Sequence, residues 1–237
     1  MLNMNPKILA LMSLGTSGIV GGGVYLYTSN LSKKTYLTFD LLKKEKTRFA
    51  LRKDSDSSFD SKWKAAWERY RKAHEVSNGK YQDKDSWGIA NWSEKKDQGE
   101  VFHEFKDMCE RKYQSYIASK DDVEYLNIKK WCTASKTIKE LIEGEKTRSI
   151  LPESGEEASW KDAWGRYKEH HKEASGNTYK SSNEWGIPEW NANSLGNDAT
   201  ANFKSKCKEQ YSKDVDFEKE LSDPLINQVI NWCTKPV

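Results

Sequence analysis

Residues Tyr81–Trp92 read YQDKDSWGIANW, and residues Tyr179–Trp190 read YKSSNEWGIPEW without a gap. The match continues outward to a tryptophan pair before each stretch and to Phe–Cys–Tyr and Trp–Cys–Thr groups after it. Every tryptophan and every cysteine of the 237-residue chain finds a counterpart in this way. Because self-similarity at a fixed spacing is typical of repeated structural units, we predict two tandem copies of one domain, at residues 33–134 and 135–237.

Each copy is predicted to be helical, because its aromatic residues recur at helical spacing. In the first copy one helix face follows the i, i+4, i+7, i+11 pattern with Trp63, Trp67, Tyr70 and His74. The second copy repeats this face from Trp160. A leading helix, a Phe–Cys–Tyr stripe and a final Trp–Cys helix bring the total to about four helices per copy.

Several residues predict where these helices and turns begin. Asp60 or Ser61 stands where the first tryptophan helix needs an N-cap. Asp223-Pro224 has the pattern of an N-cap followed by proline at the first helical position. Gly88 and Gly186, inside the repeated stretch, are expected to permit a turn.

We therefore expect an all-α fold, with an N-terminal transmembrane or signal-anchor helix followed by two small, disulfide-clipped bundles. The strand candidate Arg48–Leu51 is too short to count. Aliphatic residues are few after residue 33, so aromatic rings, which bury about 150–250 Å² each, are expected to form the cores. The predicted core tryptophans are Trp63, Trp67, Trp87, Trp92, Trp131, Trp160, Trp164, Trp185, Trp190 and Trp232.

The cysteines divide evenly between the copies, as Cys109 and Cys132 in the first and Cys207 and Cys233 in the second. In an oxidising compartment each pair is expected to form a disulfide that joins the last two helices. For loops of this size the stabilisation is about 3–4 kcal/mol. The alternative is four buried free thiols that pack as small apolar residues.

Zinc is a second alternative for the cysteines. His74 and His171 occupy matching positions, so each copy offers three of the four ligands of a structural zinc site. No C-x-x-C or H-x-x-x-H spacing supports such a site, and a histidine on a tryptophan-lined face is more often a packed, hydrogen-bonded residue. We therefore predict no bound metal.

The N-terminal segment, residues 1–32, differs from the rest in composition. Ile8–Tyr27 contains 20 residues without a charge, and a helix of that length spans about 30 Å of hydrocarbon. We expect residues 8–27 to anchor the chain in the cell membrane as a single span. The alternative is a cleaved secretory signal, with Lys7 as its n-region.

Composition and motifs argue against two classes of function. Basic and acidic residues alternate, and the net charge is only +3, whereas phosphate binding requires clustered Lys and Arg. No G-x-S-x-G, H-E-x-x-H or phosphate-binding glycine loop occurs, and the copies share core residues rather than polar ones. We therefore predict no nucleic-acid partner, no enzymatic activity, no catalytic residue and no cofactor.

The block Asn127–Ile142, NIKKWCTASKTIKELI, and the glycine-rich apolar start Leu11–Tyr27 resemble the paralogous membrane and surface proteins of haemotropic mycoplasmas. The resemblance implies a membrane-anchored protein displayed on the cell surface, with no catalytic residues. It places residues 33–237 outside the cell, as the expected disulfides do. The positive-inside rule points the other way, because Lys33 and Lys34 follow the apolar span.

The function expected on this basis is host contact or an antigenic role, with binding to a host protein through exposed residues that differ between the copies. Such stretches include Ser93–Glu100 and Asn191–Thr200. The alternative is a membrane-associated scaffold whose partners belong to its own cell.

Overall fold

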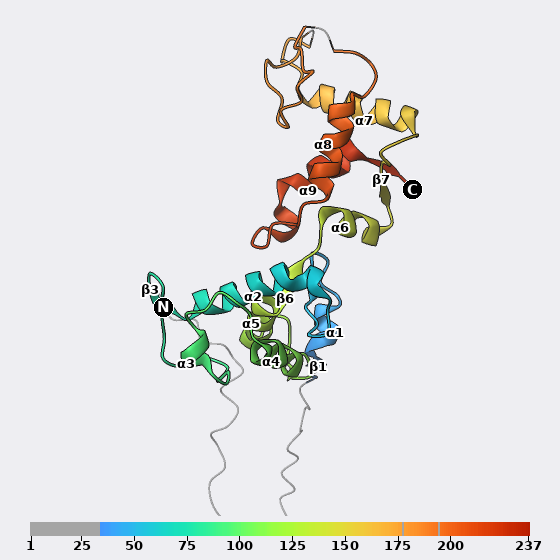
Figure 1. Cartoon of the computed structure of the whole chain (residues 1–237). Helices are drawn as coiled ribbons and strands as arrows, with labels where there is room; N and C mark the ends of the chain where they lie inside the picture. Colours follow the sequence, from blue (N-terminus) through green and yellow to red (C-terminus); the bar gives the residue numbers. More distant parts are fainter. Residues whose placement is uncertain (1–33, 177, 194) are drawn as a thin grey trace, which may run out of the picture. The chain divides into compact units, whose positions relative to one another are not determined.

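The structure, a computed structural model, describes residues 34–176, 178–193 and 195–237. We call the part from β1 to β6 repeat 1 and the part from α6 to β8 repeat 2 (Figure 1). Repeat 1 consists of β1 (Tyr36–Leu37), α1 (Thr38–Leu42), β2 (Arg48–Ala50), the 3₁₀ turn η1 (Ser57–Phe59), α2 (Asp60–Ala73), β3 (Glu75–Ser77), β4 (Lys80–Tyr81), α3 (Trp92–Lys95), α4 (His103–Tyr113), β5 (Tyr116–Ile117), α5 (Val123–Trp131) and β6 (Thr133–Ser135). Repeat 2 consists of α6 (Ile138–Glu145), β7 (Arg148–Ile150), α7 (Glu157–His170), α8 (Ala201–Tyr211), the 3₁₀ turn η2 (Glu220–Ser222), α9 (Pro224–Cys233) and β8 (Thr234–Pro236).

The prediction of an all-α fold is wrong, because short strands join the helices. In the described residues they form four two-stranded antiparallel sheets, which pair β1 with β5, β2 with β6, β3 with β4, and β7 with β8. The strand candidate dismissed as too short, Arg48–Leu51, supplies β2. Strands of two or three residues are too short to display the alternation by which a strand is recognised. The register of β2 and β7 comes instead from β6 and β8, which follow the Trp–Cys pair of each repeat.

Each repeat has its own aromatic core. Eight of the ten predicted tryptophans are buried, and Trp87 and Trp190 are half-buried against the same cores. Tyr70 is fully buried at the centre of the first core and Tyr167 at the centre of the second. Their ring centroids lie 5.0 and 4.9 Å from those of Trp131 and Trp232. Each such pair contributes about 0.5–1.5 kcal/mol beyond its buried area, so rings replace the missing aliphatic residues.

The repeated Trp-Gly-Ile stretch is a loop that packs on this central tyrosine. In repeat 1 the Tyr70 hydroxyl donates to the Asp85 carboxylate, which also accepts the Ile89 N–H at 3.0 Å. In repeat 2 the Tyr167 hydroxyl donates at 2.7 Å to Asn183, which fills the same place. One buried hydroxyl thus fixes each loop to its core.

The structure confirms the predicted turns and one of the two predicted helix caps, and it contradicts the other cap. Gly88 and Gly186 have φ of +64° and +62°, a conformation that glycine adopts without steric cost, which confirms the predicted turns. The Asp223 side chain accepts the Leu225 N–H ahead of a proline at the first helical position, also as predicted. The expected cap at Asp60 or Ser61 is wrong: α2 already includes both residues, because η1 precedes it.

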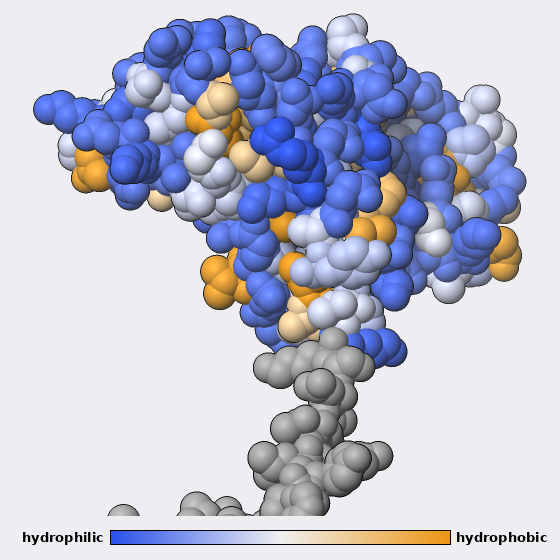
Figure 2. All heavy atoms as spheres, turned by 90° about the horizontal axis from the view of Figure 1, so that it is seen from below, coloured by the Kyte–Doolittle hydropathy of each residue, from blue (hydrophilic) through white to orange (hydrophobic). Residues whose placement is uncertain are grey.

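The predicted single-pass location in the cell membrane is contradicted by the described residues, none of whose helices is long and apolar enough to cross a bilayer. The predicted span, residues 8–27, lies outside that part of the chain. On the face shown in Figure 2, hydrophilic residues cover most of the surface and hydrophobic ones form small scattered groups.

Candidate functional site

The cysteines form one disulfide in each repeat. Cys109 bonds to Cys132 and Cys207 to Cys233, and both pairs have Cα atoms 5.5 Å apart. The bonds join α4 to the end of α5 and α8 to the end of α9, and the described residues contain no free cysteine. All four sulfurs are buried in the cores, so their role is structural.

The matching histidines, His74 and His171, are buried and use both ring nitrogens. Nδ1 of each lies 2.8 Å from the carbonyl of the central tyrosine four residues earlier. Nε2 accepts a backbone N–H, from Ser86 at 2.9 Å and from Glu184 at 3.0 Å. Both rings are therefore neutral, with the proton on Nδ1. Burial lowers the pKa of His171, and this favours the same neutral form.

One cluster in the described residues, His170, His171 and Glu184, brings three potential metal ligands within 4.8 Å of one another. His171 has no free nitrogen for a metal, because its two hydrogen bonds hold it to the backbone. The other two side chains contact each other, with His170 Nε2 3.5 Å from a carboxylate oxygen of Glu184. The cluster is therefore a structural contact around the histidine.

A network of polar contacts, which we call the joint, connects the two repeats. Outside the cores it is the most extensive polar site of the described residues. Lys136 alone separates β6 from the capping residue of α6. The Val215 N–H donates to the Lys136 carbonyl at 2.9 Å, and the Ile138 N–H donates to the Lys213 carbonyl at the same distance. These bonds hold the connection against residues 212–222, which we call the joint loop.

The aromatic ring of Phe217, in the joint loop, contacts two arginines of repeat 1. The guanidinium carbons of Arg48 and Arg69 lie 3.6 and 3.8 Å from its centroid. Arg69 also donates to the carbonyls of Lys130 and Thr133, at 2.8 and 2.6 Å, which fixes it at the end of α5. Burial, reinforced by the Arg48 charge, lowers the pKa of Arg69 to about 10, so Arg69 remains cationic at neutral pH.

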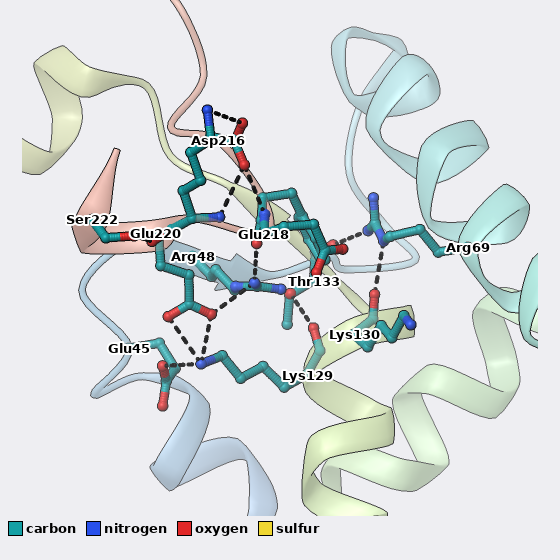
Figure 3. Close-up of polar contacts among 12 residues, drawn as sticks. Glu45, Arg48, Arg69, Lys129, Lys130, Thr133, Asp216, Glu218, Glu220 and Ser222 are labelled. Atoms are coloured by element: carbon teal, nitrogen blue, oxygen red, sulfur yellow. Dashed lines mark hydrogen bonds and ion pairs between the residues drawn. The ribbon is translucent and has the colours of Figure 1, made fainter. Parts of the chain in front are cut away.

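Glu220 extends the joint by entering a space between two cations (Figure 3). Its carboxylate lies 2.7 Å from Arg48 and 2.9 Å from Lys129. The residue has φ of +49°, a strained backbone conformation for a non-glycine residue. Such strain persists only where the surroundings impose it, and here the two ion pairs hold the side chain in place.

A second carboxylate, Glu45, balances the charge of Lys129 at 3.0 Å. It also accepts hydrogen bonds from Lys120 at 2.6 Å and from the Tyr125 hydroxyl at 2.7 Å. Burial raises the pKa of Glu45, but these hydrogen bonds and the lysine charges outweigh it and lower the pKa to about 2. Glu45 is therefore ionised at all physiological pH values.

Repeat 2 presents the same arginine pair without a joint loop over it. Arg148 starts β7 as Arg48 starts β2, and both strands pair with the following Thr-containing strand in one register. Arg166 donates to the carbonyls of Asn231 and Thr234, at 2.5 and 2.9 Å, as Arg69 does to its counterparts. We call the area around Arg148 and Arg166 the counterpart surface.

Exposure separates the two surfaces clearly. In repeat 1, Arg48 and Ser135 are only 6 % exposed, because the joint loop covers them. Their counterparts are more accessible: Arg148 is half-buried and Pro236 is exposed, as is Arg166. The Arg148 guanidinium has no acidic partner among the described residues and turns back to the Thr234 hydroxyl at 2.5 Å.

Comparisons with protein-family models, with curated proteins and with solved structures find no match to this chain. The comparison that bears on function is the one between the two repeats. In repeat 1 the arginine pair binds the joint loop, and in repeat 2 the same pair is accessible to solvent.

Sequence reasoning missed the joint. The available signal was a difference in length, since nine positions separate Tyr113 from Asp122 and twelve separate Tyr211 from Asp223. The three extra residues lie in the joint loop. The divergent stretches Ser93–Glu100 and Asn191–Thr200, which were expected to carry binding, take no part in the contacts of the joint.

Proposed function

We propose that residues 34–237 form a non-catalytic module that binds another protein, and that the counterpart surface of repeat 2 is its binding surface. The observation that carries the proposal is the joint itself. The same pair of arginines, on the same strand and helix, already binds a polypeptide segment in repeat 1. A surface that has this chemistry and is accessible to solvent suits a segment supplied from outside the chain.

The electrostatics of the counterpart surface support the proposal. Partial desolvation of the guanidinium and the neighbouring Arg148 charge lower the pKa of Arg166. The effect of Arg148 shows that two like charges lie close together, and an aromatic or anionic partner would relieve their repulsion. Guanidinium groups are also enriched among residues that dominate protein interfaces. The two disulfides are typical of oxidising compartments, which favours a host protein as the partner.

The test is a binding screen of the full chain against host-cell surface and serum proteins, with proteins of the producing cell in parallel. Arg148→Glu is the test variant. Arg52→Glu is its matched control, because Arg52 is an accessible arginine of repeat 1 that pairs with Glu110 at 3.0 Å. We expect saturable binding of a host protein that Arg148→Glu weakens at least tenfold and Arg52→Glu leaves unchanged.

Equal effects of the two variants, or no saturable partner, would contradict the proposal. A partner found only among proteins of the producing cell would favour the scaffold function instead. Circular dichroism and a thiol count on each variant separate loss of binding from loss of fold.

A further inference from the structure

The space that Glu220 enters in repeat 1 has a counterpart in repeat 2 with different chemistry. In repeat 1 the walls of this space are polar, with Arg48 and Lys129 on either side and the Glu45 network below. In repeat 2 the glutamate and the arginine are kept, as Glu145 and Arg148. The remaining wall positions change character: Lys120, Tyr125 and Lys129 correspond to Leu221, Ile226 and Ile230.

These three replacements produce an open apolar cavity of about 210 Å³. Its walls also include Leu141 and Ile142 of α6, and Arg148 lies at the rim. A cavity of about 150 Å³ is large enough to bind benzene, so this one has room for a leucine, methionine or phenylalanine side chain. Of the two cations that pair with Glu220 in repeat 1, only the arginine is kept at this cavity, because Ile230 replaces Lys129.

The cavity is continuous with the joint. Lys46 of repeat 1 lines its edge and pairs with Glu145 at 2.9 Å. Leu221, which belongs to the joint loop next to Glu220, lines it as well and is 55 % exposed. A partner segment could therefore bind over the arginine pair of repeat 2 as the joint loop binds over that of repeat 1. Its side chain three residues after the aromatic ring would then reach this cavity.

We infer that the counterpart surface of repeat 2 binds a partner segment of the form aromatic-x-x-aliphatic. The aromatic ring packs on Arg148 and Arg166, as Phe217 packs on Arg48 and Arg69. The aliphatic side chain three residues later enters the cavity, in the place that Glu220 takes in repeat 1. The exchange of Lys129 for Ile230 sets this preference, because a lysine selects a carboxylate and an isoleucine selects an apolar group. The inference rests on the proposed function and names the chemistry of the partner.

Two synthetic peptides test the preference on the full-length chain. One has the sequence of residues 214–222, DVDFEKELS, and the other replaces its seventh residue, the counterpart of Glu220, by leucine to give DVDFEKLLS. Burying a leucine side chain is worth about 1.5–3 kcal/mol, so we expect the leucine peptide to bind at least tenfold more tightly. It should also shift the methyl NMR signals of Ile226 and Ile230, and Arg148→Glu should abolish its binding.

Variants that install the chemistry of repeat 1 provide the control. Ile226→Tyr with Ile230→Lys restores two of the three changed wall positions. Ile230→Lys alone changes only a half-buried position, and it is the second variant in case the buried Ile226→Tyr change disturbs the fold. Both should reverse the preference toward the glutamate peptide. Equal binding of the two peptides, or a preference that survives Ile230→Lys, would overturn the inference.

The host-protein screen separates this inference from the proposed function. If Arg148→Glu abolishes binding of a partner and Ile230→Lys does not, the binding surface is supported and the aromatic-x-x-aliphatic preference is contradicted. A partner that neither variant releases would remove both.

Discussion

Replacing Phe217 by alanine tests whether the ring between two arginines holds the repeats together. Each guanidinium over an aromatic ring contributes about 0.5–1 kcal/mol at an exposed site and about 2 when desolvated. Arg48 is buried and Arg69 half-buried, which places each contact near 1 kcal/mol. Loss of the half-buried ring adds about 1 kcal/mol of apolar burial. We therefore expect the free energy of opening of the joint to fall by about 2–3 kcal/mol.

Hydrogen exchange measures this opening directly. The Ile138 and Val215 N–H groups bond across the joint, so both should exchange roughly 30- to 160-fold faster in Phe217→Ala. The Leu51 N–H, which bonds to the Cys132 carbonyl inside repeat 1, should keep its rate. Tyr116→Ala is the matched control, because this aromatic ring is 70 % exposed and its residue pairs with Leu37 inside repeat 1. Unchanged exchange at Val215, or equal acceleration in both variants, would refute the reasoning.

Three further predictions concern the repeats themselves. Reduction of the disulfides, which close loops with separations of 23 and 26 residues, should lower the free energy of unfolding by about 3–4 kcal/mol per bond, as measured by urea unfolding with and without dithiothreitol. Burial lowers the pKa of His171, so the unfolded chain binds a proton near pH 6.5 that the folded chain does not, and the free energy of unfolding should fall as the pH drops below about 6.5. The control variant His103→Gln should show the same fall. A constant free energy of unfolding from pH 7.5 to 5.5 would contradict this. Gly165→Ala should stabilise α7 by about 0.5–1 kcal/mol, because the added methyl meets no atom within 4 Å, whereas Gly186→Ala, at φ of +62°, should destabilise by about 1 kcal/mol; thermal unfolding would show shifts of opposite sign.

The helices and the pairing of the repeats could be predicted because their signals are local and duplicated. Trp63, Trp67 and Tyr70 share a face at helical spacing, and each is buried in α2. The glycines of the repeated stretch marked turns because few other residues adopt positive φ. The described chain also has four non-glycine residues with positive φ, including Glu220. Their residue types gave no indication of a turn.

The strands and the joint depend on contacts between distant residues, which no local pattern records. β2 exists because Thr133–Ser135 returns to it more than 80 positions later. Arg48 meets Phe217 at a separation of 169 residues, and Phe217 has no counterpart in repeat 1 that would have singled it out. A comparison of the copies finds what they share, and the candidate site consists of what only one of them has.

The position of the disulfides has a mechanical consequence. Cys132 and Cys233 lie immediately before β6 and β8, the last strand of each repeat. A pulling force along the chain would therefore cross each sulfur bridge and bypass α5 and α9. At about 3.3–3.6 Å per extended residue, each bridge prevents roughly 80–90 Å of chain from being extended. A protein held by its ends would lengthen by that much less, and the residues between the bridged cysteines would carry no load while the strands separated.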